Sequence, residues 1–153
     1  GNPNDAENVI QDKLITQLDQ LFPKFDEFRD EFVKITYTKQ DNPQNLKAKY
    51  VLNKLYGYYQ SENLFDEKGS VEHIIPEDGG MTTNIGNLIL LERDLNNLAG
   101  DVVYVDKVEF YRKSKYKWVE KFVAEHHDWG IGEVEDRAKF LAKEFYEKVL
   151  KRG

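Results

Sequence analysis

The spacing of apolar positions predicts helices over most of this chain. In residues 6–22 the apolar side chains recur every three or four positions, as on the buried face of a helix, and Pro23 ends the run. The same spacing returns in residues 25–35 and in residues 46–60, where the predicted buried stripe consists of Val51, Leu55, Tyr58 and Tyr59. In the last third of the chain it predicts further helices at about 104–113, 115–127 and 132–151. Both ends of the chain are therefore expected to be largely helical.

The middle of the chain has a different pattern, with short runs rich in β-branched residues. The run SVEHII, residues 70–75, ends at Pro76, which holds the preceding residue extended and cannot donate a ladder hydrogen bond. A second short strand is predicted at IGNLILL, residues 85–91. Residues 92–100 are helix-like and close at Gly100. Two strands and a helix, surrounded by about six helices, predict a mostly helical α+β domain.

Length and composition indicate one domain with its own core. The chain has 153 residues, of which 40% are hydrophobic, and no cysteine, which excludes disulfides and thiolate metal sites. No apolar run approaches the ~18 residues of a membrane helix, and no signal segment is recognisable. We expect a cytoplasmic fragment of a longer protein that forms one domain over residues 1–153. Its parts would be a helical segment at 1–60, the strand–strand–helix unit at about 70–100 and a second helical segment at 101–153.

Charge is distributed unevenly along the chain. The net charge of −6 argues against tight binding to nucleic acids, because phosphate contacts need Lys and Arg. Residues 107–121, however, carry six basic side chains against two acidic ones. Two interpretations stay open: the segment is a solvated helix face, or it follows a nucleic-acid backbone.

Four polar side chains mark the strand–strand–helix unit. Glu72 and His73 end the first apolar run, Asn87 follows 14 residues after His73, and Asn96 comes 9 residues later. Glu72 and Asn96 offer hard oxygen ligands, which suit Mg²⁺ or Mn²⁺ better than Zn²⁺. His73 can take a proton from water, since the unperturbed pKa of histidine lies near neutrality. With one metal ion, these groups could hydrolyse a phosphodiester.

Each of these residues also has an ordinary structural explanation. His73 can be a hydrogen-bonded structural histidine and Glu72 an exposed strand residue. Asn87 can be a turn residue, and Asn96 and Asn97 can belong to a helix surface or cap. Neighbouring side chains on a flat strand face opposite sides, so Glu72 and His73 can share a site only if the strand bends or bulges.

The spacing resembles that of the HNH, or His-Me finger, nucleases with a ββα-metal core. Their pattern is an acidic residue, His, two apolar residues and Pro, then an Asn in the second strand and an Asn or His on the helix. EHIIP at 72–76, Asn87 and Asn96 follow that pattern. More closely, about residues 46–150 resemble the C-terminal nuclease domain of GmrSD-type restriction enzymes. The matching positions are EHIIP, IGNLILL and LNNLAG, then Lys107, Tyr111, Ser114, Trp129 and Arg137.

The resemblance implies a role for each position of the motif. His73 would be the general base, Glu72 and Asn96 would bind a divalent metal, and Asn87 would hold the loop after His73. Lys107 would contact phosphate or steady the site. The wider HNH group commonly has Asp where this chain has Glu72, so the carboxylate here lies further from the backbone.

Other residues are interpreted as structural. His126 and His127 have no partner at the spacing of a metal site and are expected to form the polar end of a helix. Trp129 is expected to anchor the core, and Arg137 is expected to form a salt bridge on an amphipathic helix. Asn97 is an alternative to the preceding residue as metal ligand, although the spacing disfavours it.

We therefore interpret the chain as a metal-dependent DNA endonuclease domain that uses Mg²⁺ or Mn²⁺. It would be part of a larger restriction or phage-defence protein, whose other domains handle nucleotide binding and regulation as in GmrSD-type systems. Lys107, Lys113 and Lys115 are expected to contact the DNA backbone. Two alternatives stay open: a catalytically inactive HNH-like module that regulates or binds other proteins, and an enzyme that cuts RNA.

Overall fold

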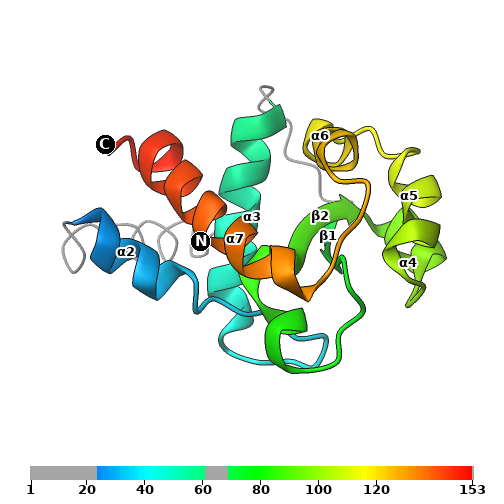
Figure 1. Cartoon of the computed structure of the whole chain (residues 1–153), viewed down its shortest axis with the longest axis horizontal. Helices are drawn as coiled ribbons and strands as arrows, with labels where there is room; N and C mark the ends of the chain where they lie inside the picture. Colours follow the sequence, from blue (N-terminus) through cyan, green and yellow to red (C-terminus); the bar gives the residue numbers. More distant parts are fainter. Residues whose placement is uncertain (1–23, 61–68, 153) are drawn as a thin grey trace, which may run out of the picture.

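Helices surround a small two-stranded sheet (Figure 1). The computed structural model describes residues 24–60 and 69–152, so the helix expected at residues 6–22 lies outside the described residues. The described elements are α2 (Phe25–Phe32), α3 (Asn45–Gln60), β1 (Gly69–His73), η1 (Gly80–Thr83), η2 (Ile85–Asn87), β2 (Leu88–Glu92), α4 (Arg93–Ala99), α5 (Tyr104–Tyr111), α6 (Lys117–Glu125), α7 (Ile131–Glu144) and η3 (Phe145–Val149). The predicted class, a mostly helical α+β fold, is confirmed.

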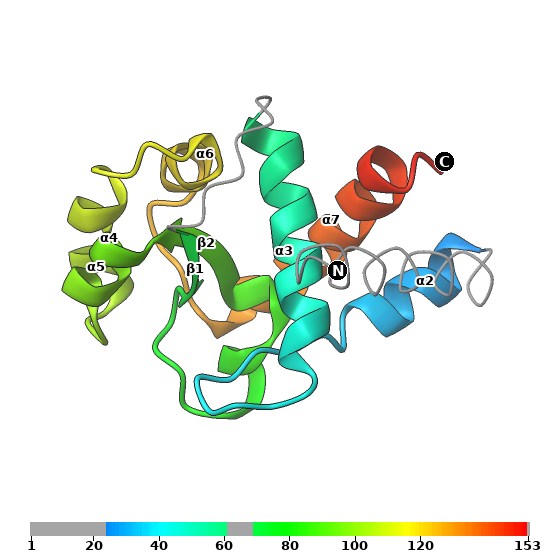
Figure 2. The same cartoon turned by 180° about the vertical axis from the view of Figure 1, so that it is seen from behind.

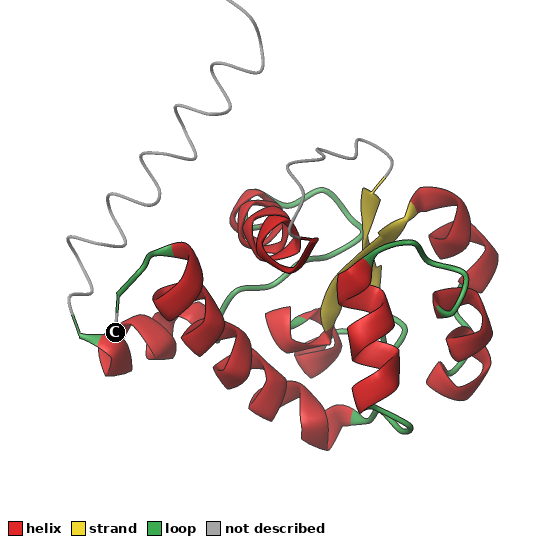
Figure 3. Cartoon of the chain, turned by 90° about the horizontal axis from the view of Figure 1, so that it is seen from above, coloured by secondary structure: helices red, strands yellow, loops and turns green. Residues whose placement is uncertain are grey.

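The helices are divided between the two sides of the sheet. Figures 1 and 2 show α2, α3 and α7 on one side of the strands and α4 and α5 on the other. Figure 3, viewed from above, shows the strands enclosed by helical segments. Within residues 24–60 and 69–152, none of the helices is both long and apolar enough to span a bilayer.

The two strands pair antiparallel and one to one, with His73 opposite Leu88 at one end. The second strand is shorter than predicted, because Ile85–Asn87 form a 3₁₀ turn where the sequence pattern favoured a strand. Asn84 starts this turn, since its side-chain oxygen accepts a hydrogen bond of 2.9 Å from the Gly86 amide. An Asn side chain commonly competes in this way with the strand ladder for a backbone amide.

Helix α7 packs directly on the backbone of η2. A Cβ atom added at Gly86 would lie 1.9 Å from the Val134 carbonyl oxygen, so glycine is needed for this close approach. Arg137 then donates hydrogen bonds from Nη1 to the carbonyls of Gly86 at 2.9 Å and Leu88 at 2.7 Å. These contacts fix the start of β2 against α7.

An aromatic cluster joins α2 and α3 to the C-terminal helix. The ring of Phe145 lies 6.1 Å from that of Phe28 and 5.8 Å from that of Phe32, measured between centroids. It also lies 6.5 Å from the ring of Tyr50 on α3. Burial of these rings stabilises the packing of α2 and α3 against η3.

The last turn of α3 differs from the predicted buried stripe. Val51 and Leu55 are buried as predicted, but Tyr56 is buried as well and Tyr58 is 43% exposed. The reason is that the end of α3 packs against α6 through Tyr59, whose ring lies 5.5 Å from that of Trp118, and this contact leaves Tyr58 partly in solvent.

Candidate active site

His73 closes β1, and its ring is held by the backbone of a distant segment. Nε2 lies 2.8 Å from the carbonyl oxygen of Tyr37. Because a carbonyl oxygen can only accept, Nε2 carries the proton in the neutral ring and Nδ1 keeps its lone pair. The Tyr37 backbone is fixed in turn, since its amide donates to the Thr83 carbonyl at 2.9 Å. The fold thus determines which nitrogen of His73 can accept a proton.

Burial favours the neutral form of His73. The residue is 2% exposed, and burial lowers the pKa of its imidazole below the ordinary value. The Tyr37 carbonyl and the Glu77 carboxylate, 3.8 Å from Nε2, raise this pKa but do not reverse the shift. A ring that is neutral at pH 7 can accept a proton, which is the first requirement for a general base.

Glu72 and Lys107 form a buried ion pair beside His73. Lys107 Nζ lies 3.3 Å from Glu72 Oε1 and donates a hydrogen bond of 2.6 Å to the His73 carbonyl. Burial raises the pKa of the Glu72 carboxyl and lowers the pKa of Lys107, while the attraction between the two opposes both shifts. The Tyr111 hydroxyl is also close enough to Glu72 to lower the pKa of its carboxyl.

The regular pairing of β1 separates the side chains of Glu72 and His73. Pairing with β2 continues one to one through both residues, so the described strand has no bulge that would bring them to one side. Glu72 meets Lys107 of α5, whereas His73 meets the Tyr37 carbonyl. The structure connects them through Lys107, which binds the carboxylate of one and the carbonyl of the other.

Three charged residues outside the motif complete the surroundings of this site. Lys39 Nζ lies 3.0 Å from the Asp101 carboxylate, and the Lys39 amide donates to Glu77 Oε1 at 3.0 Å. The charge of Lys39 lowers the pKa of both Glu72 and His73. Sequence reasoning missed these residues, because no spacing relates them to the motif and only folding brings them together.

Asn87 joins the loop after His73 to the second strand. Its buried amide nitrogen donates to the carbonyls of Ile75 at 2.9 Å and Thr82 at 2.8 Å. Its amide oxygen accepts from the Ile75 amide at 2.9 Å and from Trp129 Nε1 at 3.1 Å. Both donors and both lone pairs of the side chain are therefore engaged by protein groups.

Asn96 satisfies the open edge of β1. Its amide nitrogen donates to the Val71 carbonyl at 3.0 Å and to the Ser70 hydroxyl at 2.9 Å. These bonds use the amide hydrogens, which leaves the amide oxygen as the atom able to bind a cation. Asn97, the alternative ligand, is exposed. The register of α4 thus turns Asn96 toward the strand that bears Glu72.

The donor atoms suit a hard divalent ion, although they are few. Glu72 Oε2 is buried and makes no hydrogen bond of ordinary geometry among the described residues, although the Tyr111 hydroxyl lies close to this carboxylate and would compete with a metal for it. A carboxylate oxygen and an amide oxygen are ligands that Mg²⁺ and Mn²⁺ accept. No group of three or more His, Asp or Glu side chains able to hold a metal occurs in the described part of the chain. A site made of Glu72 and Asn96 would need water and phosphate oxygens as its other ligands.

The basic segment divides into buried and exposed lysines. Lys107 is 1% exposed and turned toward Glu72. In that position its ammonium does not face a DNA backbone. The resemblance also implied that Lys107 could steady the site, and its contacts agree with that role. Lys113 and Lys115 are exposed and can reach a phosphate.

The salt bridge expected for Arg137 is wrong for the described residues. Its guanidinium bonds to backbone carbonyls, and the rings of Trp118, Phe122 and Trp129 lie 5.0–6.0 Å from Cζ. The reason is that α7 turns this position inward to η2 and β2, where carbonyls are the available acceptors. Trp129 is buried, as a core anchor should be, and His126 follows the last residue of α6.

Comparison with known families gives a match that includes the whole candidate site. Residues 22–144 match the family described as GmrSD restriction endonucleases, C-terminal domain. The match begins before residue 46, where the resemblance seen in the sequence began, and so includes α2. No curated protein matches the chain.

Proposed function

The chain belongs to the family of GmrSD restriction endonuclease C-terminal domains, and from this premise we propose that it is a metal-dependent DNA endonuclease domain with His73 as its general base. The observation that carries the proposal is the contact of His73 Nε2 with the Tyr37 carbonyl, which leaves Nδ1 as the proton acceptor. The domain would act within a larger restriction or phage-defence protein whose other domains regulate the cut.

In this mechanism His73 accepts a proton from a water molecule at Nδ1 as the water attacks the phosphorus. The lowered pKa keeps the ring neutral before the transfer. The Tyr37 carbonyl holds the ring in its orientation throughout. Glu77, 3.8 Å from Nε2, stabilises the imidazolium that forms.

Glu72 and Asn96 would hold a divalent ion, Mg²⁺ or Mn²⁺, through Glu72 Oε2 and the Asn96 amide oxygen. Because β1 is regular at Glu72 and His73, the ion and the base would act on one phosphodiester only if the strand bends there when metal and DNA bind. A bound ion of this kind stabilises negative charge on the phosphate and on the leaving oxygen. Lys107 keeps the Glu72 carboxylate in place. Asn87 keeps the loop after His73 in place.

Cleavage of supercoiled plasmid DNA tests the proposal. The wild-type chain and two variants, His73→Ala and His127→Ala, are incubated with Mg²⁺, Mn²⁺ or EDTA. His127 is exposed, so it is the matched histidine control. We expect nicking that needs a metal, a loss of about 10²–10⁴-fold in His73→Ala, and no change in His127→Ala. A single-stranded RNA as second substrate separates DNA cutting from RNA cutting.

Two results would count against this assignment. Equal turnover by His73→Ala and the wild type would show that another group is the base. Loss of helical circular dichroism in His73→Ala would instead assign the residue a structural role.

A catalytically inactive module that binds other proteins is the second candidate, because Lys107 already occupies one oxygen of Glu72. Calorimetric titration with Mn²⁺ separates the two. The endonuclease proposal expects binding that Glu72→Gln and Asn96→Ala each weaken and Asn97→Ala does not. Absence of binding favours the inactive module, and a large effect of Asn97→Ala would transfer the ligand role to that residue.

Lys113 and Lys115 are proposed to contact the DNA backbone without base preference. Each Lys→Ala change should lower the slope of affinity against salt by about one, and the isolated domain should bind weakly, at about 10⁻⁴–10⁻⁶ M. Titrations at several salt concentrations in a His73→Ala background measure both quantities, with Lys47→Ala as the control. If the variant with both Lys113→Ala and Lys115→Ala shows the same salt dependence of affinity as its parent, other residues hold the DNA.

A further inference from the structure

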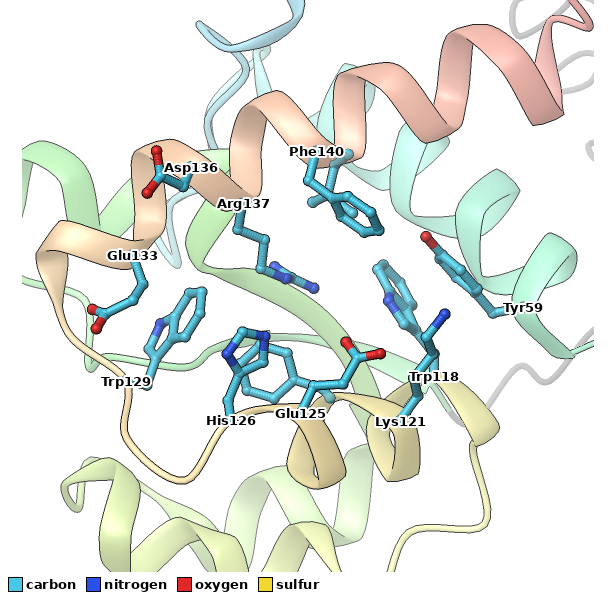
Figure 4. A pocket seen from close by; sticks show the side chains of 12 residues that line it. Tyr59, Trp118, Lys121, Glu125, His126, Trp129, Glu133, Asp136, Arg137 and Phe140 are labelled. Carbon is cyan, nitrogen blue, oxygen red and sulfur yellow. The ribbon is translucent and has the colours of Figure 1, made fainter.

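A cavity of about 380 Å³ lies between the end of α3 and the facing sides of α6 and α7. Its walls carry the aromatic rings of Tyr59, Trp118, Phe122, His126, Trp129 and Phe140. Figure 4 shows five of these rings, those of Tyr59, Trp118, His126, Trp129 and Phe140, around a common space, into which Arg137 extends from α7. The volume is sufficient for a planar ligand of the size of a nucleoside.

Arg137 supplies the cavity with a buried donor that lacks an acceptor. Nη1 is used by the carbonyls of Gly86 and Leu88. Nη2 is buried and has no hydrogen-bond partner in the described part of the chain. The hydroxyl of Tyr59, on another wall of the cavity, is also buried and also has no hydrogen-bond partner among the described residues. Because buried donors are costly to leave unpaired, these two atoms predict a ligand with hydrogen-bond acceptors.

Glu125 contributes a hydrogen-bond acceptor to the same space. In Figure 4 its carboxylate turns inward, toward the region between Arg137 and Trp118. A planar group with an acceptor beside an N–H donor can pair with both Arg137 and Glu125. The edges of nucleobases have this arrangement, and their faces stack on aromatic side chains.

A basic hollow of about 700 Å³ adjoins the cavity. The two share Tyr59 and Lys121, and Lys121 Nζ lies 5.3 Å from the centroid of the Tyr59 ring. The charged residues of the hollow are Lys117, Lys121, Lys148, Glu120 and Glu144. The hollow has one more lysine than carboxylates, whereas the cavity also carries Glu125, Glu133 and Asp136. A phosphate next to a bound base would therefore have to lie on the side of the hollow, against the lysines.

We propose that the cavity binds the base of a nucleotide and that the adjoining lysines bind its phosphate. The proposal extends the proposed function, since a nuclease meets nucleotides as substrate, but binding requires neither His73 nor a metal. A free nucleotide and an unstacked base in a single strand present the same chemistry. Trp129, a wall of the cavity, donates to Asn87, so an occupied cavity would contact the residue that braces the loop after His73.

Tryptophan fluorescence measures this binding directly, because both tryptophans of the chain line the cavity. The His73→Ala protein, without divalent metal, is titrated with dGMP, deoxyguanosine, deoxyribose 5-phosphate and a single strand of about eight nucleotides. Guanine carries a carbonyl oxygen beside two N–H donors, so dGMP is the reference ligand. We expect saturable quenching by dGMP, weaker binding of deoxyguanosine, and none of the sugar phosphate.

Variants identify the contacts. Arg137→Lys keeps the charge but loses Nη2, and it should weaken dGMP binding about tenfold. Arg137 also anchors α7, so Glu125→Gln gives an independent test, with a loss of about fivefold. Its matched control on α7, Glu135→Gln, should bind like the parent protein. Lys121→Ala should weaken binding of dGMP and leave binding of deoxyguanosine unchanged.

The outcomes separate the ligand sources and the failure of the proposal. If only the single strand quenches the fluorescence, the cavity binds a base within a strand. If dGMP quenches it too, the cavity accepts both a free nucleotide and a base within a strand. The proposal is overturned if dGMP, deoxyguanosine and the strand all fail to quench the fluorescence saturably. It is also overturned if Glu125→Gln and Phe140→Ala, a change in one aromatic wall of the cavity, both bind dGMP as tightly as the parent protein. Cleavage is not measured here, so this result and the plasmid result can fail independently.

Discussion

Two buried cations, Lys107 and Arg137, are accommodated in opposite ways. Lys107 is 1% exposed, and its ammonium lies 3.3 Å from the Glu72 carboxylate. Arg137 is 7% exposed, and its hydrogen bonds go to the carbonyls of Gly86 and Leu88 while three aromatic rings surround the guanidinium. One site therefore contains a balanced charge pair, and the other contains a cation without a carboxylate hydrogen bond within the described residues.

The difference follows from the chemistry of the two groups. An ammonium is compact and strongly hydrated, so it needs an opposite charge when buried, whereas a guanidinium is delocalised and accepts ring faces and carbonyls. Burial lowers the pKa of Arg137 to about 10, which still leaves it charged at neutral pH. Around Lys107 the donors are used to hold the candidate active site. Around Arg137 one nitrogen, Nη2, has no hydrogen-bond partner among the residues that the structure describes, and we propose that a ligand binds it.

Replacing Lys107 by Met should produce the largest loss of stability. The variant leaves the Glu72 carboxylate buried without its partner, and we expect the free energy of unfolding to fall by about 3–5 kcal/mol. Urea unfolding at neutral pH measures the change.

A second substitution tests whether the loss comes from the charge. Glu72→Gln added to Lys107→Met removes the unpaired carboxylate and should restore most of the stability. Lys113→Met, at an exposed position, should stay within about 0.5 kcal/mol of the wild type. If Lys107→Met costs no more than Lys113→Met, the ion pair does not form in solution.

Replacing Arg137 by Met should cost less, at about 2 kcal/mol. This variant leaves carbonyl groups unpaired but leaves no charge behind, so the penalty is that of lost hydrogen bonds. The same urea titration measures it. A loss larger than that of Lys107→Met would contradict the comparison, because it would indicate a counter-charge for Arg137.

Sequence could predict the residues of the candidate site better than their partners. The spacing of Glu72, His73, Asn87 and Asn96 is local, since all four lie within one strand–turn–strand–helix unit. Tyr37, which fixes the tautomer of His73, lies 36 residues away and acts through its backbone carbonyl, so its side-chain identity carries no signal.

The same limit explains the errors. Periodicity placed Arg137 on an amphipathic helix but could not show that α7 turns it toward a backbone rather than a carboxylate. Periodicity also continued the second strand back through Gly86, where the hydrogen bond from the Gly86 amide to the side-chain oxygen of Asn84 sets a 3₁₀ turn instead. The helices were predictable because their apolar stripes are long, whereas these features depend on single hydrogen bonds.

Asn96→Ala should cost about 1 kcal/mol, because it removes the donors that satisfy the Val71 carbonyl and the Ser70 hydroxyl at the edge of β1. This extends the comparison to a neutral side chain. Asn96, like Lys107, donates a hydrogen bond to a backbone carbonyl of β1. Asn97→Ala, at an exposed position, is the control and should change stability by less than about 0.5 kcal/mol. Equal losses in the two variants, measured by urea unfolding, would place the register of α4 in error.

The smallest effect concerns His73, whose ring stays neutral when buried although the Tyr37 carbonyl and the Glu77 carboxylate lie next to it. Its pKa is lowered in the folded state, chiefly by burial and despite Tyr37 and Glu77. At pH values above the unfolded pKa of about 6.5, His73 is neutral in both the folded and the unfolded state, so its titration does not reduce the free energy of unfolding. As the pH falls below that value, the unfolded chain binds the proton first, so the free energy of unfolding decreases until the folded ring is protonated too.

Two other groups, His126 and Glu72, also change the pH dependence of stability, so both must contribute equally to the proteins that are compared. The pKa of His126 is also lowered, while that of Glu72 is raised and therefore acts in the opposite direction, favouring the folded state at low pH. We therefore compare His126→Phe with the double variant His126→Phe/His73→Phe by urea unfolding between about pH 5 and 8. The double variant should lose less stability toward acid, because the proton that the unfolded chain takes up at His73 is gone. Parallel profiles would show that the ring of His73 is solvated in the folded protein and that burial does not lower its pKa.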